Sequence, residues 1–181
     1  MKKTLIALGT FKQDDIFYDT DLKKIFSSPT NPKKSRGYSI NVLATLISLP
    51  IINWLNKHFV SFQIIGNVVV ILIFCLIALY FSKQYVIKLY DNIEVREHFF
   101  SSLEYKEFLT QGTKNSKIVV ILWWCLIVLS AFLLLLFIVT AIFTFLFLGV
   151  MLFFATSLLT YSNVIERYKI IKQLNKELTN A

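Results

Sequence analysis

The stretch that decides the fold is residues 118–161, IVVILWWCLIVLSAFLLLLFIVTAIFTFLFLGVMLFFATSLLTY. These 44 residues contain no charged side chain and no proline. As one helix they would extend for roughly 66 Å, about twice the ~30 Å hydrocarbon core of a bilayer. The run therefore predicts a helical hairpin that crosses a membrane twice, with its outer turn at residues 137–141.

A second apolar region covers residues 38–82 and is interrupted near its middle by Asn53, Asn56, Lys57 and His58. These polar groups indicate a turn, so we predict four spans, at residues 38–54, 59–81, 118–137 and 142–161. Of the 181 residues, 56% are hydrophobic, which agrees with this class. The predicted fold class is an all-α integral membrane protein with four transmembrane helices in two hairpins. Pro50 would bend the first span, which leaves a re-entrant first hairpin open.

The basic residues predict the orientation. Of the 19 Lys and Arg, eight precede residue 38, six lie in residues 83–117, four follow residue 161, and Lys57 alone lies in a short hairpin tip. By the positive-inside rule, the N- and C-termini and the central loop are cytoplasmic. The apolar stretch after the first lysines is too short for a signal peptide, so we expect a multi-pass protein of the bacterial cytoplasmic membrane. The net charge of +8 predicts contact with anionic lipid and argues against nucleic acid.

Five segments follow from this plan: a cytoplasmic head and linker (1–37), a first hairpin (38–82), a cytoplasmic amphipathic helix (83–117), a second hairpin (118–161) and a cytoplasmic helical tail (162–181). In the head, residues with strand preference flank residues 13–15 and could form a β-hairpin. A lone hairpin is marginal in water, so it would dock on the membrane domain or on a partner. Residues 27–32 carry two prolines and predict a linker.

Two amphipathic helices are expected outside the spans. Asp91 as an N-cap, with Glu94 three residues later, predicts a helix over residues 92–110 that ends near Gly112. In the tail, apolar residues recur at steps of three and four, which predicts that the last span continues as an amphipathic helix packed on the central one. The tail residues concerned are Val164, Tyr168, Ile171, Leu174 and Leu178.

The spans carry little chemistry. No ionisable side chain lies well inside any of them, which argues against a proton-coupled transporter, a pump or a membrane metalloenzyme. The chain has no Gly-rich phosphate loop and no G-x-S-x-G elbow. We therefore predict a protein that is not an enzyme, with no catalytic residue, cofactor or metal. Cys75 and Cys125 are interpreted as packed thiols and not as a redox pair.

Four residues are candidates for helix packing or for contact with a partner: Asn53, Trp54, Asn67 and Gly149. Asn67 can bond across helices or contact a ligand, and Gly149 can permit a close helix approach or a slight kink. Asn53 lies beside the expected bend at Pro50, and Trp54 fits the aromatic belt at an outer span end.

Residues 49–55, Leu-Pro-Ile-Ile-Asn-Trp-Leu, together with the strand-like residues 16–22, resemble the tandem five-transmembrane family of Gram-positive bacteria. The resemblance covers about the first third of the chain. It implies a strand-forming head followed by a Pro-x-x-Asn-Trp membrane entry, and it implies for some members immunity to membrane-damaging toxins of type VII secretion. This chain departs from the family in having four predicted spans instead of five, and Asn56-Lys57 where a second proline is usual.

Two functional classes remain. The first is a non-enzymatic immunity protein that binds a membrane-active toxin of a secretion or bacteriocin system within the bilayer. The second is an accessory subunit of a membrane transporter, sensor kinase or secretion complex. The sequence also leaves open a homo-oligomer, including a channel formed by several copies.

Overall fold

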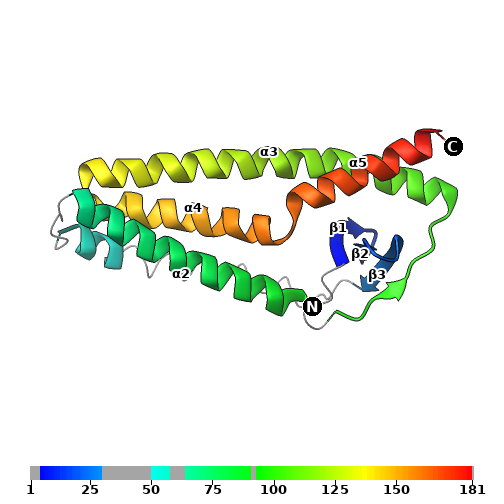
Figure 1. Cartoon of the computed structure of the whole chain (residues 1–181), viewed down its shortest axis with the longest axis horizontal. Coiled ribbons are helices and arrows are strands. Elements are labelled where there is room, and N and C mark those ends of the chain that lie inside the picture. The colour runs from blue at the N-terminus through cyan, green and yellow to red at the C-terminus, as the bar shows by residue number, and fades with distance from the viewer. Residues whose placement is uncertain (1–4, 30–49, 58–63, 91–92, 181) are drawn as a thin grey trace. The chain divides into compact units, whose positions relative to one another are not determined.

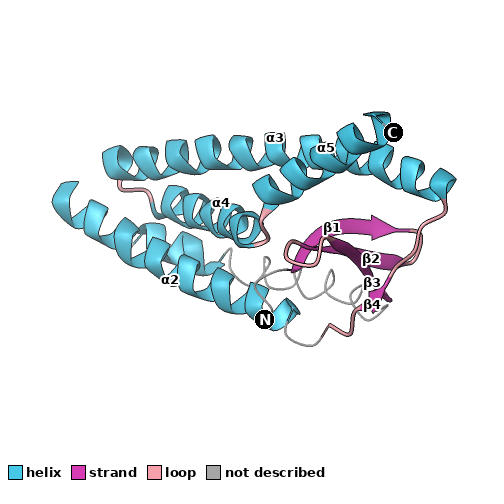
Figure 2. Ribbon diagram, turned by 45° about the vertical axis from the view of Figure 1, so that its right-hand side comes forward, coloured by secondary structure: helices cyan, strands magenta, loops and turns pink. Residues whose placement is uncertain are grey.

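A computed structural model of the chain describes residues 5–29, 50–57, 64–90 and 93–180. The described part is mostly helical and carries a small sheet (Figure 2). Residues 50–57 are helical. The other elements, in chain order, are β1 (Leu5–Phe11), β2 (Asp14–Asp19), β3 (Lys24–Pro29), α2 (Ile64–Tyr90), β4 (Arg96–Glu97), α3 (Ser102–Thr140), α4 (Phe143–Tyr161) and α5 (Val164–Asn180) (Figure 1).

The chain divides into two compact units. The sheet unit comprises Met1–Thr30, Lys83–Trp124 and Leu158–Ala181, and the helical unit comprises Asn31–Ser82 and Cys125–Ser157. Helices α2, α3 and α4 each contribute residues to both units.

Three of the described helices, α2, α3 and α4, are long and apolar enough to cross a membrane. They correspond to the predicted spans 59–81, 118–137 and 142–161. The predicted first span, 38–54, lies outside the described residues except for residues 50–54, which are helical. The turn predicted at residues 137–141 is wrong for its first four residues, which belong to α3. The second hairpin turns at Ala141, which has a φ of 56°, and α4 begins two residues later. The four-span arrangement stays a prediction.

The head forms a sheet and not a lone hairpin. β1 and β2 pair antiparallel as the predicted hairpin, but the turn lies at Lys12 and Gln13 and not at residues 13–15, because Asp14 and Asp15 begin β2. β3 and β4 extend the sheet in the order β1-β2-β3-β4. A bulge falls between Ala7 and Gly9, where Gly9 has a φ of 134° that favours glycine. The all-α class is therefore wrong for the sheet unit.

The predicted linker at residues 27–32 is wrong for its first three residues. Ser27 pairs with Ile16 of β2 on one side and with Arg96 of β4 on the other. Pro29 is the last residue of β3, a position at a strand end where the missing amide of proline is tolerated. Residues 30–32 lie outside the described residues.

The sheet is held by a core that it shares with two helices of the same unit. Phe108 and Leu109 of α3 and Ile171 of α5 are buried against residues of β1 and β2. The head was predicted to dock on another part of the protein or on a partner, and it packs on α3 and α5 of the same chain. The buried members of this core are Leu8, Phe11, Ile16, Phe108, Leu109, Ile171 and Leu174.

The helix predicted over residues 92–110 has wrong bounds. Residues 93–101 are not helical and include β4, and Asp91 and Asn92 lie outside the described residues. α3 begins instead directly after Ser101. The Ser101 hydroxyl accepts a hydrogen bond from the Glu104 amide at 3.4 Å, and the Ser101 amide donates one to the Glu104 carboxylate at 3.2 Å. This reciprocal pair is a capping box, and it prevails because the preceding residues pair with β3.

The helix also continues through Gly112 to Thr140. A Cβ at Gly112 would lie 3.5 Å from Ile171 Cδ1, so this glycine faces α5 within the sheet unit. Gly112 therefore allows α5 to pack closely on α3 and does not end the helix.

The tail packs on α3, which confirms its predicted role. Val164, Ile171 and Leu174 are buried along one face of α5. α4 and α5 are separated by Ser162 and Asn163, and Asn163 has a φ of 56°. The last span therefore does not continue without a break, because one left-handed residue ends α4 and turns the chain into α5.

Candidate functional site

Gly149 of α4 lies against α3 within the helical unit. A Cβ built on it would lie 2.8 Å from Leu134 Cδ2 and 3.3 Å from the Leu134 backbone nitrogen. The Gly149 carbonyl accepts a hydrogen bond of 2.9 Å from the hydroxyl of Ser130, which is 2% exposed. A small residue and a buried hydroxyl thus join the two helices, as in helix pairs that pack inside lipid.

Asn67 of α2 is also buried in the helical unit, with 2% of its surface exposed. Its Nδ2 donates to the Ile138 carbonyl of α3 at 3.4 Å. Its Oδ1 is buried and accepts no hydrogen bond from the residues that the structure describes. Asn67 therefore links α2 to α3 through its amide nitrogen alone.

Asn53 and Trp54 lie in the helical segment 50–57, and both are exposed. Their neighbour Asn56 has a defined role that the sequence analysis missed. Asn56 Oδ1 accepts from the amide of Thr144 at 3.1 Å, and Nδ2 donates to the Thr144 hydroxyl at 2.6 Å. Asn56 thereby caps the start of α4 from 88 residues away in sequence, a distance over which no local pattern could have indicated the pairing.

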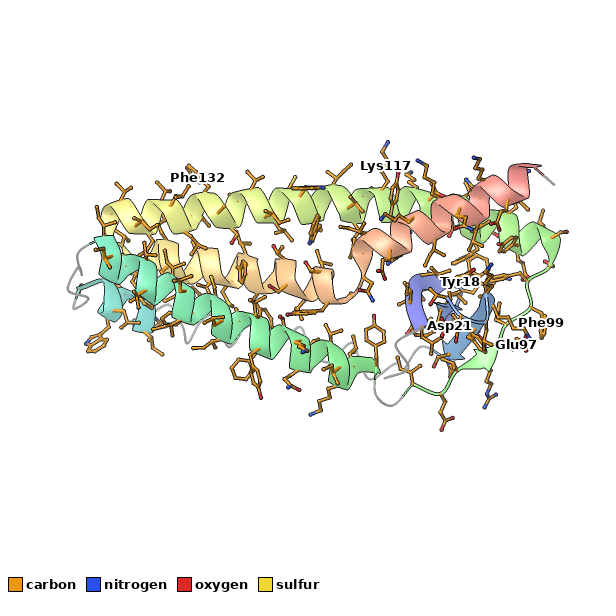
Figure 3. The ribbon with its side chains drawn as sticks, viewed as in Figure 1. Tyr18, Asp21, Glu97, Phe99, Lys117 and Phe132 are labelled. Carbon is orange, nitrogen blue, oxygen red and sulfur yellow. The ribbon has the colours of Figure 1, made fainter. Side chains whose placement is uncertain are left out.

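Most of the remaining apolar surface of the three long helices faces outward. Within the most apolar 18-residue stretch of α3, only 6% of the residues are buried. In the corresponding stretch of α2, 11% are buried. Phe132 of α3 points away from its helix with 56% of its surface exposed (Figure 3). Such surfaces suit lipid or another apolar helix and not water. Cys75 and Cys125 are free thiols; Cys75 is half-buried, whereas Cys125 is exposed and is not packed among the described residues as predicted.

The sheet unit carries an apolar surface of its own. Phe99 and Leu103 expose 82% and 78% of their side chains, and Phe99 points outward from the segment before α3 (Figure 3). Next to Leu103 lies the α3–α5 groove, a cavity of about 490 Å³. It is lined by Ser102, Leu103, Lys106, Thr110, Asn175 and Leu178.

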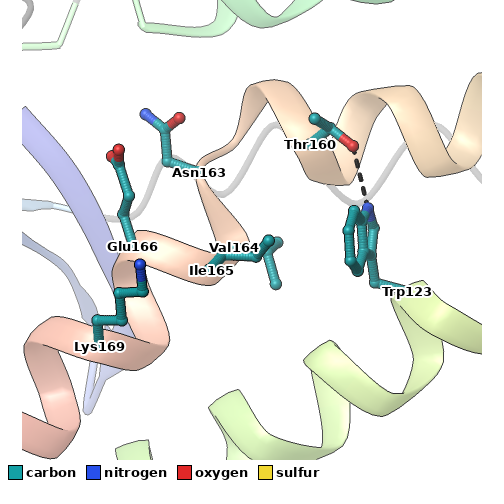
Figure 4. Close-up of a pocket in the computed structure, with 7 residues that line it drawn as sticks. All are labelled: Trp123, Thr160, Asn163, Val164, Ile165, Glu166 and Lys169. Carbon is teal, nitrogen blue, oxygen red and sulfur yellow. Dashed lines mark hydrogen bonds between the residues drawn. The ribbon is translucent and has the colours of Figure 1, made fainter.

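A second cavity of the sheet unit, the α4–α5 pocket, has a volume of about 280 Å³ and lies where α4 gives way to α5 (Figure 4). The indole Nε1 of Trp123 on α3 donates to the Thr160 hydroxyl at 3.0 Å and forms one wall. The first turns of α5 form the other. The lining residues are Trp123, Thr160, Asn163, Val164, Ile165, Glu166 and Lys169.

Two charged groups of the sheet unit differ in their surroundings. Lys12 at the β1–β2 turn pairs with Glu104 of α3; the hydrogen bond first, and the opposite charge second, raise the pKa of Lys12. Arg167 of α5 is half-buried beside Gly9, and its Nε has no acceptor among the described residues. Burial lowers the pKa of Arg167.

Within the described residues no three His, Cys, Asp or Glu side chains gather to hold a metal ion. Comparisons with family models, with curated proteins and with solved structures find no match to this chain.

Proposed function

We propose that this chain is a non-enzymatic, multi-pass protein of the bacterial cytoplasmic membrane that acts by binding another membrane component through its spans. Its most concrete form is an immunity protein that binds a membrane-active toxin within the bilayer. Both termini and the sheet unit then lie on the cytoplasmic side, where the basic residues of the chain are concentrated.

The observation that carries this proposal is the outward-facing apolar surface of α3. Val128, Phe132 and Leu135 expose 65%, 56% and 61% of their side chains. They lie within an uncharged run of 44 residues, so a partner there would meet no Asp, Glu, Lys, Arg or His side chain. Recognition would rest on side-chain packing, which suits a toxin that is itself an apolar helix. An enzyme in the membrane would instead need ionisable groups in these segments.

An accessory subunit of a transporter, sensor kinase or secretion complex is the second candidate. It is favoured by the exposed Phe99 and Leu103 and by the adjacent α3–α5 groove. Exposed aromatic and aliphatic side chains beside a groove are typical of surfaces that bind protein partners. In this case the sheet unit, and not the spans, would make the decisive contact.

A pair of matched variants separates the two candidates. The chain is produced together with a membrane-active protein toxin, any such protein encoded beside its gene being tested first, and survival and membrane potential are measured. The double variant Phe132→Ala, Leu135→Ala removes two exposed side chains from α3, and Phe99→Ala, Leu103→Ala removes two from the sheet unit. Because all four side chains are exposed, neither variant should lose a core contact.

The immunity proposal expects protection by the wild type and by the sheet-unit variant, and loss of protection in the α3 variant. Loss of protection in the Phe99→Ala, Leu103→Ala variant, with protection kept in the α3 variant, would favour the accessory-subunit function. Toxicity unchanged by the wild-type chain would contradict immunity to that toxin. Cross-links from Phe132 to a second copy of the chain would instead assign the α3 surface to a homo-oligomer.

A further inference from the structure

The α4–α5 pocket lies at the depth where the apolar helices end. Trp123 is six residues beyond Lys117, the last charge before the uncharged run, and Thr160 is one residue before the end of α4. At about 1.5 Å per residue, Trp123 lies roughly 9 Å beyond that charge. If α3 and α4 span a bilayer, the pocket falls in the headgroup layer, where tryptophan is enriched.

The polar lining of the pocket comes from one side of the α5 start. Glu166 and Lys169 lie three residues apart on α5, which places them on neighbouring positions of the helix surface, and Asn163 directly precedes the helix. Figure 4 shows their side chains on the same pocket. One carboxylate, one ammonium and one amide therefore face a single cavity.

The two charges of the pocket are not paired within the described residues. Neither Glu166 nor Lys169 lies within 4.0 Å of an oppositely charged group there, whereas Lys12 and Lys24 both have such partners. The apolar wall is formed by Trp123, Val164 and Ile165, and Ile165 exposes 44% of its side chain. The pocket thus offers a cation, an anion and an apolar flank to one ligand.

We infer that the α4–α5 pocket binds the headgroup of a phospholipid that carries both a phosphate and a primary ammonium, as in phosphatidylethanolamine. The phosphate would meet the Lys169 ammonium, and the lipid ammonium would donate to the Glu166 carboxylate. The glycerol and upper acyl carbons would lie against Ile165 and the Trp123 ring. A purely anionic headgroup would leave Glu166 facing a like charge.

The test uses the full-length protein in mild detergent and native mass spectrometry with added lipid. Wild type should bind phosphatidylethanolamine about fivefold more tightly than phosphatidylcholine, whose trimethylated nitrogen cannot donate. Glu166→Gln should bring that ratio close to one. Lys169→Gln should weaken the binding of both lipids, while Lys172→Gln, the same charge change outside the pocket lining, should leave both unchanged.

Each other outcome contradicts the assignment. Equal binding of the two lipids by wild type would overturn it, as would equal behaviour of the Lys169 and Lys172 variants. Tighter binding of phosphatidylglycerol, increased further by Glu166→Gln, would make the pocket an anionic-lipid site. Displacement of the lipid by an equal concentration of free phosphoethanolamine would assign it to a soluble ligand. The variants are on exposed side chains, and an unchanged melting temperature shows that they fold.

Discussion

At Gly149 the backbones of α3 and α4 approach so closely that an added Cβ would make tight contacts. A Cβ there would be 2.8 Å from Leu134 Cδ2 and 3.3 Å from the Leu134 nitrogen. The side chain can turn away, but the backbone atom can move only with the helix. Gly149→Ala should therefore lower the free energy of unfolding in detergent by about 1–3 kcal/mol, as for overpacked cores.

The double variant Gly149→Ala, Leu134→Ala supplies the control, because it removes the nearest side chain and leaves the backbone contact. It should recover part of the loss measured by thermal unfolding. A melting temperature that Gly149→Ala leaves at the wild-type value would show that the helices are not in this contact.

The ion pair of Lys12 with Glu104 links the β1–β2 turn to the start of α3. Because the pKa of Lys12 is raised in the folded protein, its contribution to stability is complete below the ordinary value of 10.5 and disappears as pH rises through the raised value. The melting-temperature difference between wild type and Lys12→Gln should be constant at neutral pH and shrink above about pH 10.5. A difference that grows with pH would contradict the pairing.

At the scale of the elements, the start of α4 depends on the helical segment 50–57. Asn56→Ala removes the cap on Thr144 and should destabilise the protein by about 0.5–2 kcal/mol. Asn53→Ala is the matched control, since Asn53 is exposed on the same segment. Equal unfolding temperatures for the two variants would show that the cap contributes nothing.

Helix α3 offers a second test at this scale, through two exposed valines. Val128 lies near the middle of the predicted span 118–137 and Val139 lies beside the turn, with 65% and 84% of their side chains exposed. In water both would accept lysine. In a bilayer, Val128→Lys should cost about 2.5–3.5 kcal/mol and lower membrane insertion, while Val139→Lys can reach the headgroups. Equal insertion of both variants would argue against a span.

The sequence predicted the elements whose cause is local. The approximate positions of the second hairpin turn and of the β1–β2 turn, and the apolar stripe of α5, follow from patterns within a few residues. The start of α3 was misplaced because two sequences could cap a helix, Asp91 with Glu94 and Ser101 with Glu104. The choice between them depends on the pairing of Arg96 and Glu97 with β3, which lies about 70 residues earlier in the chain.

The candidate contacts show the same limit. Gly149 and Asn67 could be selected because small and amide residues are conspicuous in an apolar helix. Asn56 and Ser130 were not selected, since their partners become neighbours only when the helices assemble. The α4–α5 pocket combines a tryptophan of α3 with the first turns of α5, and its existence depends on the left-handed residue Asn163.

At the scale of the whole molecule, the central claim is that the apolar helices cross a membrane with the sheet unit on the cytoplasmic side. The distribution of the basic residues supports this orientation, and labelling of single cysteines tests it directly. The native Cys75 and Cys125 are first replaced by Ala. Single cysteines then replace Lys57, at the predicted outer tip, and Asn115, on the sheet-unit part of α3; both positions are exposed.

The measurement is the reaction of each variant with a membrane-impermeant maleimide in intact cells and again after permeabilisation. We expect Lys57→Cys to react in intact cells and Asn115→Cys to react only once the membrane is opened. Labelling of Asn115→Cys in intact cells would place the sheet unit outside and contradict the account.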